Sequence, residues 1–501
     1  MALFDTDVLI VGAGPTGLLL AGDLAVRGVP CMIVDREPQG SKLSRAFVVH
    51  ARTLEQLDAR GVAGELIETG TIFTTMRLFD RLDIDMSLLR SRFPFLLCTP
   101  QYNTERVLAD RASRMGVEVL RGVEVVGLHQ DADGVDVNMR IDRTVHTRRA
   151  KFVVGADGAR SVVRDALGVP FLGRSAVESV MLADVRLRRP PTRELALEAG
   201  AEGFCFIAPF GDGRYRIIAW DRRRQLPSSA PVTLQEVSDI VRRVMGADLG
   251  LYDVRWLTRF HSDERQVPHY RVGRVFLAGD AAHVHSPVGG QGMNTGLQDA
   301  ANLGWKLAAA VQGWAPDGTL DTYHAERHPV GRMVLRLSGR LLTTALARTR
   351  RARAARAALP IVNLFPPAAQ RLRETMSGLA ISYPAPAASH PLTGRRVPDV
   401  RLTGEAGRLY EALREGRFVL LAPAGEPAAT ETPLPAHVLH ATPRSPRLPL
   451  MLVRPDGYVA WASTAEDPAV VSSLRSALTA WCGLPRSTSI RTARAQDSPR
   501  R

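Results

Sequence analysis

The sequence predicts an α/β fold in which a Rossmann-like nucleotide-binding domain is interleaved with a β-sheet domain and followed by a third domain. Three observations predict it. A glycine-rich turn lies between a strand-like run and a helical pattern near the N-terminus, further glycine-bearing turns follow apolar runs, and residues 178–265 change to strand-like alternation. Because 501 residues exceed one compact core, two or three domains are expected.

The first element is a phosphate-binding turn. Val8 to Val11 has the character of a buried strand, Leu18 to Val26 has a helical pattern, and Gly12-Ala13-Gly14-Pro15-Thr16-Gly17 lies between them. Glycines at this spacing let the backbone approach a pyrophosphate, and the N–H groups of the following helix point at the anion. Asp35 ends the next apolar run, where a carboxylate can accept from a ribose hydroxyl. We expect a dinucleotide site rather than an ordinary tight turn.

Three later turns decide which dinucleotide is expected. Asp157-Gly158 follows an apolar run at 152–154, Gly279-Asp280 follows another at 275–278, and Gly289-Gly290-Gln291-Gly292-Met293-Asn294 precedes a long helical pattern. Each dipeptide alone is most often only a turn. In this order, with a strand before two of them, they predict an FAD site.

The motifs resemble those of single-component (class A) FAD-dependent aromatic hydroxylases, which share the para-hydroxybenzoate hydroxylase fold, and are most similar to polyketide and rifampicin monooxygenases. The resemblance rests on Gly12 to Gly17, Asp157 to Ser161, Gly279 to His283 and Pro287 to Asn294. It implies that Asp280 binds the ribityl chain and that Asp157-Gly158 serves FAD and the nicotinamide cofactor. The family often has Glu where this chain has the shorter Asp35. The expected cofactor-binding residues are Gly12, Gly14, Pro15, Thr16, Gly17, Asp35, Arg36, Arg45, Gln101, Val125, Asp157, Gly158, Gly279, Asp280, Pro287, Gly290, Gly292, Met293 and Asn294.

The expected function is NADPH- or NADH-dependent hydroxylation of a polycyclic, polyketide-type aromatic in antibiotic biosynthesis or modification. Reduced, non-covalently bound FAD reacts with O2 to a C4a-hydroperoxide that attacks the ring. The helix starting near Gly292 would stabilise the reduced flavin, and an apolar pocket would exclude water. A Baeyer–Villiger or epoxidising monooxygenase stays open as the alternative. A halogenase lacks support because its Trp-x-Trp-x-x-Pro signature is absent, and the intact 287–294 loop argues against a non-enzymatic flavoprotein.

The alternating segments between residues 178 and 265 predict the substrate-binding sheet. Phe204 to Ile207 and Arg214 to Trp220 alternate around the Gly211-Asp212-Gly213 turn signal. We expect Phe95, Phe206, Trp220 and Phe260 to bind substrate, with core packing as the alternative for each. The resemblance gives catalytic roles to Arg45, Arg216 and Pro287, although Arg214 competes with Arg216 for the role of holding or releasing the flavin.

The expected domains are an FAD-binding domain at 1–177, to which 71–100 adds part of the substrate domain, a substrate domain at 178–265, and completion of the FAD-binding domain at 266–382. A helix around Tyr323 is expected to end at Pro329. After a linker at 383–393, residues 394–501 resemble a thioredoxin-like domain with a disordered tail. Because the domain has no cysteine pair, we expect packing or subunit contact rather than disulfide exchange.

Composition restricts the partners. The net charge of +14 and the run Arg348, Arg350, Arg351, Arg353 and Arg356 could suggest nucleic acid, but only three of 65 basic residues are lysine, and no recognition motif accompanies them. A solvated helix face is the preferred interpretation. Four scattered cysteines favour a reducing compartment, so we expect a cytoplasmic monomer or homodimer with no metal and no membrane segment.

Overall fold

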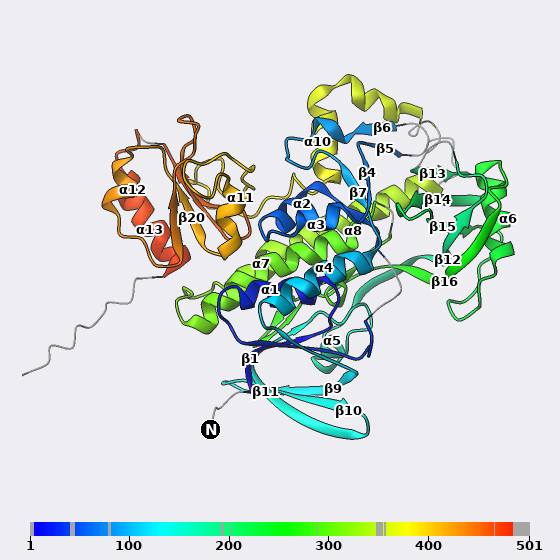
Figure 1. The fold of residues 1–501 in the computed structure, drawn as a ribbon, viewed down its shortest axis with the longest axis horizontal. Coiled ribbons are helices and arrows are strands. Elements are labelled where there is room, and N and C mark those ends of the chain that lie inside the picture. Colours follow the sequence, from blue (N-terminus) through cyan, green and yellow to red (C-terminus); the bar gives the residue numbers. More distant parts are fainter. Residues whose placement is uncertain are drawn as a thin grey trace, which may run out of the picture.

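A computed structural model describes residues 5–40, 46–78, 82–191, 195–200, 202–287, 289–346, 354, 357–464 and 466–483. Figure 1 shows a central body of sheet and long helices, a second sheet beside it in green, and a smaller C-terminal body in orange and red on the other side. The expected mixed α/β class is confirmed.

The central sheet is built around β1 (Thr6–Val11), which pairs in parallel with β2 (Cys31–Asp35) and β11 (Thr144–Gly155). Leu9 and Ile10 are fully buried, as expected for a parallel strand covered on both faces. The sheet is extended by β8 (Glu118–Arg121), β17 (Arg271–Val272), β18 (Val275–Leu277), β9 (Val123–Gln130) and β10 (Val135–Ile141).

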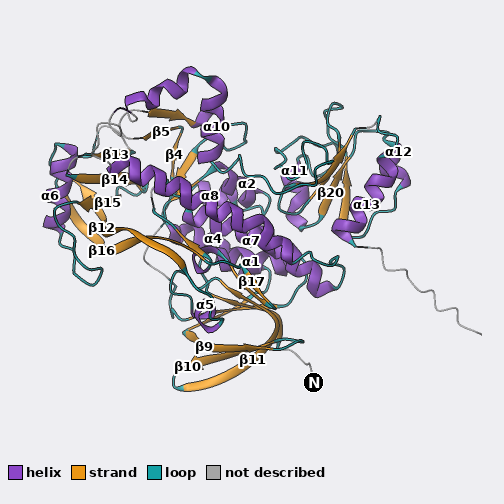
Figure 2. Ribbon diagram, turned by 180° about the vertical axis from the view of Figure 1, so that it is seen from behind, coloured by secondary structure: helices purple, strands orange, loops and turns teal. Residues whose placement is uncertain are grey.

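Helices cover this sheet. In Figure 2 the two longest, α7 (Gly292–Gln312) and α8 (Asp321–Leu346), cross the middle of the molecule side by side. α7 ends at Gly313, whose φ of 72° is the left-handed conformation that glycine adopts without strain. The remaining helices of this body are α1 (Pro15–Ala25), α2 (Ala51–Asp58), α3 (Ala63–Ile67), α4 (Gln101–Arg114) and α5 (Val162–Ala166).

The expectation that Pro329 ends its helix is wrong, because α8 continues through it to Leu346. A proline inside a helix costs about 3 kcal/mol, since it removes one backbone bond. Hydrogen bonds from distant residues hold the helix at the two positions before Pro329. Gln266 Nε2 donates to the His328 carbonyl at 2.9 Å, and Arg327 is fully buried with its Nε 2.7 Å from Asp299 Oδ1. These contacts outweigh the local preference.

The second sheet has the order β13-β14-β15-β12-β16-β19, and the strands predicted around Phe206 and Trp220 are confirmed as β14 and β15. β12 begins at Leu172, before the expected boundary at 178. α6 (Leu234–Met245) packs on one face. The strands are β12 (Leu172–Leu187), β13 (Ala196–Ala199), β14 (Gly203–Pro209), β15 (Tyr215–Asp221), β16 (Leu251–Gln266) and β19 (His283–Val284).

Short elements from residues 48–98 cover the other face and share its apolar core. They form two small sheets, β3-β7-β4 and β5-β6, next to the helical segment 359–376. Their bounds are β3 (Val48–Val49), β4 (Thr71–Phe73), β5 (Thr75–Leu78), β6 (Leu82–Asp85), β7 (Leu96–Cys98), η1 (Met86–Leu88), η3 (Leu359–Leu364) and α10 (Pro366–Met376). The described residues of the 71–100 segment pack against the second sheet, and their assignment to the substrate domain stays a prediction.

The C-terminal body is a four-stranded sheet with the order β21-β20-β22-β23. β20 and β21 are parallel and the other pairs antiparallel, which is compatible with the thioredoxin-like expectation but does not test it. Its elements are β20 (Phe418–Leu421), β21 (Val438–Ala441), β22 (Leu450–Val453), β23 (Val459–Ser463), α11 (Leu409–Ala412), η4 (Leu413–Glu415), α12 (Pro427–Glu431) and α13 (Val470–Cys482). The expected tail lies outside the described residues.

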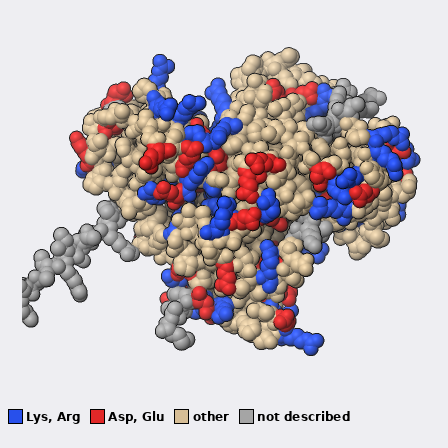
Figure 3. All heavy atoms as spheres, viewed as in Figure 1, with Lys and Arg blue, Asp and Glu red and all other residues tan. Residues whose placement is uncertain are grey.

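Arg348, Arg350, Arg351, Arg353 and Arg356 also lie outside the described residues. On the face shown in Figure 3, basic and acidic side chains are interspersed. Within the described ranges, no helix has the length and apolar character needed to cross a bilayer.

Candidate functional site

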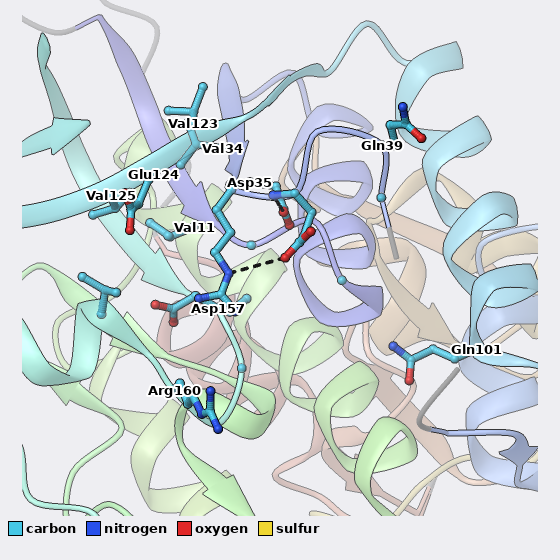
Figure 4. Close-up of a pocket in the computed structure, with 18 residues that line it drawn as sticks. Val11, Val34, Asp35, Gln39, Gln101, Val123, Glu124, Val125, Asp157 and Arg160 are labelled. Carbon is cyan, nitrogen blue, oxygen red and sulfur yellow. Dashed lines mark hydrogen bonds and ion pairs between the residues drawn. The ribbon is translucent and has the colours of Figure 1, made fainter. Parts of the chain in front are cut away.

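A cavity of about 540 Å³ opens at the carboxyl ends of β1, β2 and β11. This edge of a parallel sheet is where doubly wound folds bind nucleotides. Figure 4 shows side chains from β1, β2 and β9 around it, together with Asp157 from the turn that follows β11. The lining includes eight predicted cofactor residues: Gly12, Gly14, Asp35, Arg36, Gln101, Val125, Asp157 and Gly158.

The glycines of the first turn have different steric roles. Gly12 has a φ of +107°, and a Cβ there would lie 2.4 Å from the Ala156 carbonyl oxygen. A Cβ at Gly17 would lie 2.0 Å from the Gly12 oxygen, so these two glycines are needed for the chain to pack on itself. At Gly14 a Cβ would meet no atom within 4 Å. Gly14 therefore faces open space at the N-terminus of α1, where a phosphate would approach.

Asp35 and Asp157 are two of the four acidic residues that line the first cavity. Asp35 accepts from Ala13 N–H at 2.6 Å and from Glu37 N–H at 2.8 Å, so it holds the phosphate turn in addition to lining the cavity. Asp157 Oδ2 accepts from Val163 N–H at 3.2 Å, and its buried Oδ1 has no partner among the described residues. Burial raises the pKa of the Asp157 carboxyl group above its usual value. An incoming hydroxyl group could donate to that free oxygen.

A second cavity of about 280 Å³ continues from the first, because the two share Gly14, Gln101, Ala156 and Gly158. The exposed side chain of Asp280 lies on its wall, and Gly292 and Met293 bring the N-terminal end of α7 to it. Free N–H groups and the helix dipole at that end favour a negative charge. The predicted residues around this cavity are Gly14, Pro15, Thr16, Gln101, Gly158, Asp280, Pro287, Gly290, Gly292 and Met293.

Two buried contacts fix the Gly279-Asp280 turn. Asp299 Oδ2 accepts from Gly279 N–H at 3.1 Å and lies 2.7 Å from His283 Nε2. A Cβ at Gly279 would lie 2.8 Å from Thr16 Oγ1, so only glycine brings this turn so close to the first motif. The turn therefore directs Asp280 toward the second cavity, while Gly279 itself serves as packing.

A third, apolar cavity of about 60 Å³ lies beside the second and shares Phe47, Pro287 and Gly290 with it. Phe206 is on its wall, with its ring centroid 5.4 Å from that of Phe47. The other lining residues are Val48, His50, Met76, Arg77, Leu96, Leu195, Leu197, Phe204, Ile218 and Gly289. Sequence reasoning did not single out Phe47, His50, Met76 or Leu96 for this site.

His50 connects the apolar cavity with the glycine loop. Its Nε2 donates to the Gly289 carbonyl at 2.9 Å, and its backbone N–H donates to Asn294 Oδ1 at 2.9 Å. Asn294 Nδ2 donates in turn to the Gly290 and Val48 carbonyls, at 2.7 and 2.9 Å. Burial lowers the pKa of His50 to about 4, so the ring is neutral near pH 7. Asn294 thus fixes the backbone of the glycine loop through hydrogen bonds.

Four further predicted residues, Arg216, Trp220, Phe95 and Phe260, do not line any of these three cavities. Arg216 is fully buried in a bidentate pair with Asp184, at 2.9 and 2.8 Å. Trp220 donates through its indole N–H to the Glu178 carbonyl at 3.0 Å. Phe95 and Phe260 are partly buried against core clusters. Their proposed roles stay predictions, and Arg45 lies outside the described residues.

The residues around the first two cavities fit FAD. The space beside Gly14, the unpartnered oxygen of Asp157 and the carboxylate of Asp280 would accommodate a pyrophosphate and hydroxyl groups, and the start of α7 would face the redox ring. Over the described ranges, no three His, Cys, Asp or Glu side chains are arranged to hold a metal ion.

Comparison with known proteins gives two family matches: a FAD binding domain over residues 5–338 and the C-terminal domain of aromatic-ring hydroxylases over residues 390–485. The chain is 38% identical to rifampicin monooxygenase of Streptomyces venezuelae over 95% of this chain and 98% of that protein. It is 38% identical to the 12-dehydrotetracycline 5-monooxygenase/anhydrotetracycline 6-monooxygenase of Streptomyces rimosus, over 96% and 99%. The structure of the anhydrotetracycline hydroxylase OxyS from Streptomyces rimosus superimposes with a TM-score of 0.85, at 35% identity over 96% and 99% of the two chains.

Proposed function

The chain belongs to the FAD-dependent aromatic-ring hydroxylases, a family of monooxygenases, and we propose that its substrate is a polycyclic aromatic of polyketide type. Bound FAD supplies the chemistry, which is the transfer of one oxygen atom from O2 to an aromatic ring at the expense of NADPH or NADH. The relatives named for rifampicin and tetracycline intermediates support this substrate class.

The observation that carries the proposal is the contact between the cofactor and apolar cavities. They share Phe47, Pro287 and Gly290, so a substrate ring in the third cavity would lie next to the part of the second cavity that these residues line. Aromatic and aliphatic side chains around it would exclude water, which limits release of hydrogen peroxide. Phe206 would contact the substrate ring, and Asp157 and Asp280 would orient FAD.

The third cavity must widen to admit such a substrate. Its volume of about 60 Å³ is far below the roughly 300–1,000 Å³ of typical ligand sites. Met76 on β5 and Leu197 on β13 form part of its wall, and both strands lie at the edge of a small or open sheet. We expect these two strands to move apart on substrate binding.

The test is anaerobic reduction of the FAD-loaded enzyme by NADPH and by NADH, followed as loss of flavin absorbance. A polycyclic substrate, with anhydrotetracycline and rifampicin as first probes, should accelerate reduction, and O2 should then give a product heavier by one oxygen atom. Phe206→Ala should keep FAD and lose the acceleration. Peroxide as the sole product with every polycyclic phenol tested would contradict the proposed substrate class.

A further inference from the structure

The turn between β22 and β23 is buried although it carries charged side chains. Arg454 and Asp456 are each 2% exposed and Tyr458 is 1% exposed. Turns usually lie at the surface, where water satisfies their polar groups. Here the turn enters the central body, and all of its charges must find partners there.

The side chains of this turn pair with α7 and α8. Arg454 donates to both oxygens of Glu326, at 2.6 and 2.9 Å, and Glu326 also accepts from Lys306 Nζ at 2.7 Å. Asp456 pairs with Arg454 and accepts from Asn302 Nδ2 at 3.3 Å. The cluster is balanced, with two positive and two negative groups. Burial favours the neutral acid, but the charges of Arg454 and Lys306 outweigh it and hold the pKa of Glu326 below its usual value.

The main chain of the same turn holds α2. The Asp456 carbonyl accepts from Arg52 Nη2 and from Gln56 Nε2, both at 2.8 Å, and the Arg52 guanidinium lies 4.7 Å from the Tyr458 ring centroid. Arg52 and Gln56 lie on the first two turns of α2, which starts directly after His50. The start of α2 at the apolar cavity is therefore fixed from the C-terminal body.

A second set of bonds leads from α8 to the cofactor cavities. Arg327 follows Glu326 in sequence and donates to Asp299 Oδ1 at 2.7 Å and to the Thr295 carbonyl at 3.2 Å. Asp299 holds the Gly279-Asp280 turn through Gly279 N–H. Neighbouring residues of α8 thus bind the C-terminal turn and the residues that orient Asp280.

We propose that the C-terminal domain is a clamp on the cofactor site, in which Arg454 and Asp456 are positioning residues that hold α2, α7 and α8 in the arrangement that binds FAD. A domain without a cysteine pair then contributes to turnover through geometry alone. Its loss weakens FAD binding and raises the share of NAD(P)H that ends as hydrogen peroxide. The larger share of hydrogen peroxide rests on the proposed function, whereas the weaker FAD binding does not.

The test uses the full-length double variant Arg454→Met/Asp456→Asn, which removes one positive and one negative charge and leaves Lys306 paired with Glu326. FAD dissociation constants are measured by titrating apoprotein, and peroxide is measured per NADPH consumed. We expect the FAD dissociation constant to rise at least tenfold and the peroxide share to increase. If the double variant does not fold, Gln56→Leu removes one bond to the turn and the bond from Arg60 to Gln56 Oε1 without changing charge, while Arg60 keeps its ion pair with Asp23. This variant should raise the constant about fivefold.

The matched control is Val438→Ala on the edge strand β21, which β20 separates from the β22–β23 hairpin. It should lower the thermal midpoint of the protein without changing FAD affinity. Wild-type FAD affinity in the folded double variant, or in Gln56→Leu, would overturn the clamp. The clamp would also be overturned if Val438→Ala lost as much FAD affinity as the double variant at the same loss of stability. Because FAD affinity needs no substrate, a wild-type enzyme that oxidises no aromatic would refute only the proposed function.

Discussion

Replacing Gly14 by alanine should abolish tight FAD binding without harming the fold. Gly14 has φ and ψ of −76° and −179°, which any residue adopts, and its Cβ would meet no atom of the protein within 4 Å. The new methyl group would instead project into the space shared by the first two cavities. It would thus collide only with a bound cofactor.

The substitution should raise the stability of the apoprotein slightly and lower its affinity for FAD. Glycine to alanine at a compatible backbone conformation stabilises a protein by about 0.4–1 kcal/mol, because the unfolded chain loses freedom. A phosphate displaced from the turn loses at least one charge-assisted hydrogen bond, worth about 1.5–3 kcal/mol. At 1.4 kcal/mol per factor of ten, that weakens FAD binding about 10- to 150-fold.

The assay compares urea unfolding of the apoprotein with FAD titration followed by flavin fluorescence. Gly12→Ala is the control, because its φ of +107° and the 2.4 Å approach to Ala156 predict loss of stability itself. Wild-type FAD affinity in Gly14→Ala, or a loss of apoprotein stability comparable with that of Gly12→Ala, would refute the assignment of this space to the pyrophosphate.

Three further predictions concern single side chains. Asp280→Ala should weaken FAD binding about 10- to 150-fold in equilibrium titration while the apoprotein unfolds as before, because the carboxylate is exposed to the second cavity; unchanged affinity would remove Asp280 from the site. The pKa of His50 is about 4 in the folded protein and 6.5 in the unfolded chain. Its contribution to the free energy of unfolding is therefore complete above pH 6.5 and is lost as the pH falls toward 4. Wild type should lose about 2 kcal/mol more unfolding free energy than His50→Gln between pH 7 and 5, and parallel pH profiles would contradict this. Cys482→Ser should leave NAD(P)H oxidation unchanged, since burial raises the pKa of that thiol and keeps it unreactive; selective loss of turnover would give the thiol a catalytic role.

The backbone of the cofactor cavities could be predicted because its requirements are local. Gly12 and Gly17 are needed where chain segments nearly touch, and Asp35 ends a short apolar strand, so sequence spacing alone indicates the turn. The second function of Asp35, which is to accept from Ala13 N–H, depends on how the strand end meets the turn and leaves no sequence signal.

The apolar cavity could be predicted only in part. Alternation placed Phe206 and Trp220 on the same face of the sheet, but it does not tell how far along the strands the cavity extends. Phe206 faces the cavity, whereas the indole of Trp220 bonds to Glu178 and stacks on Phe204. Phe47 and His50 reach the cavity from another segment, where they resemble ordinary residues near a helix start.

The interface of the C-terminal body was also beyond sequence reasoning. Asp456-Gly457 has the composition of an ordinary exposed hairpin turn, and nothing local indicates that it enters a charged cluster with Glu326. The continuation of α8 through Pro329 has the same origin, because contacts from distant residues outweigh the local preference.

The central claim is that the connected cavities form an FAD site, and its most direct measurement is titration of apoprotein with FAD followed by denaturation of the complex. The account predicts saturation at one FAD per chain, a yellow protein, and release of intact FAD on denaturation. A folded protein that stays colourless and takes up no added FAD would contradict it.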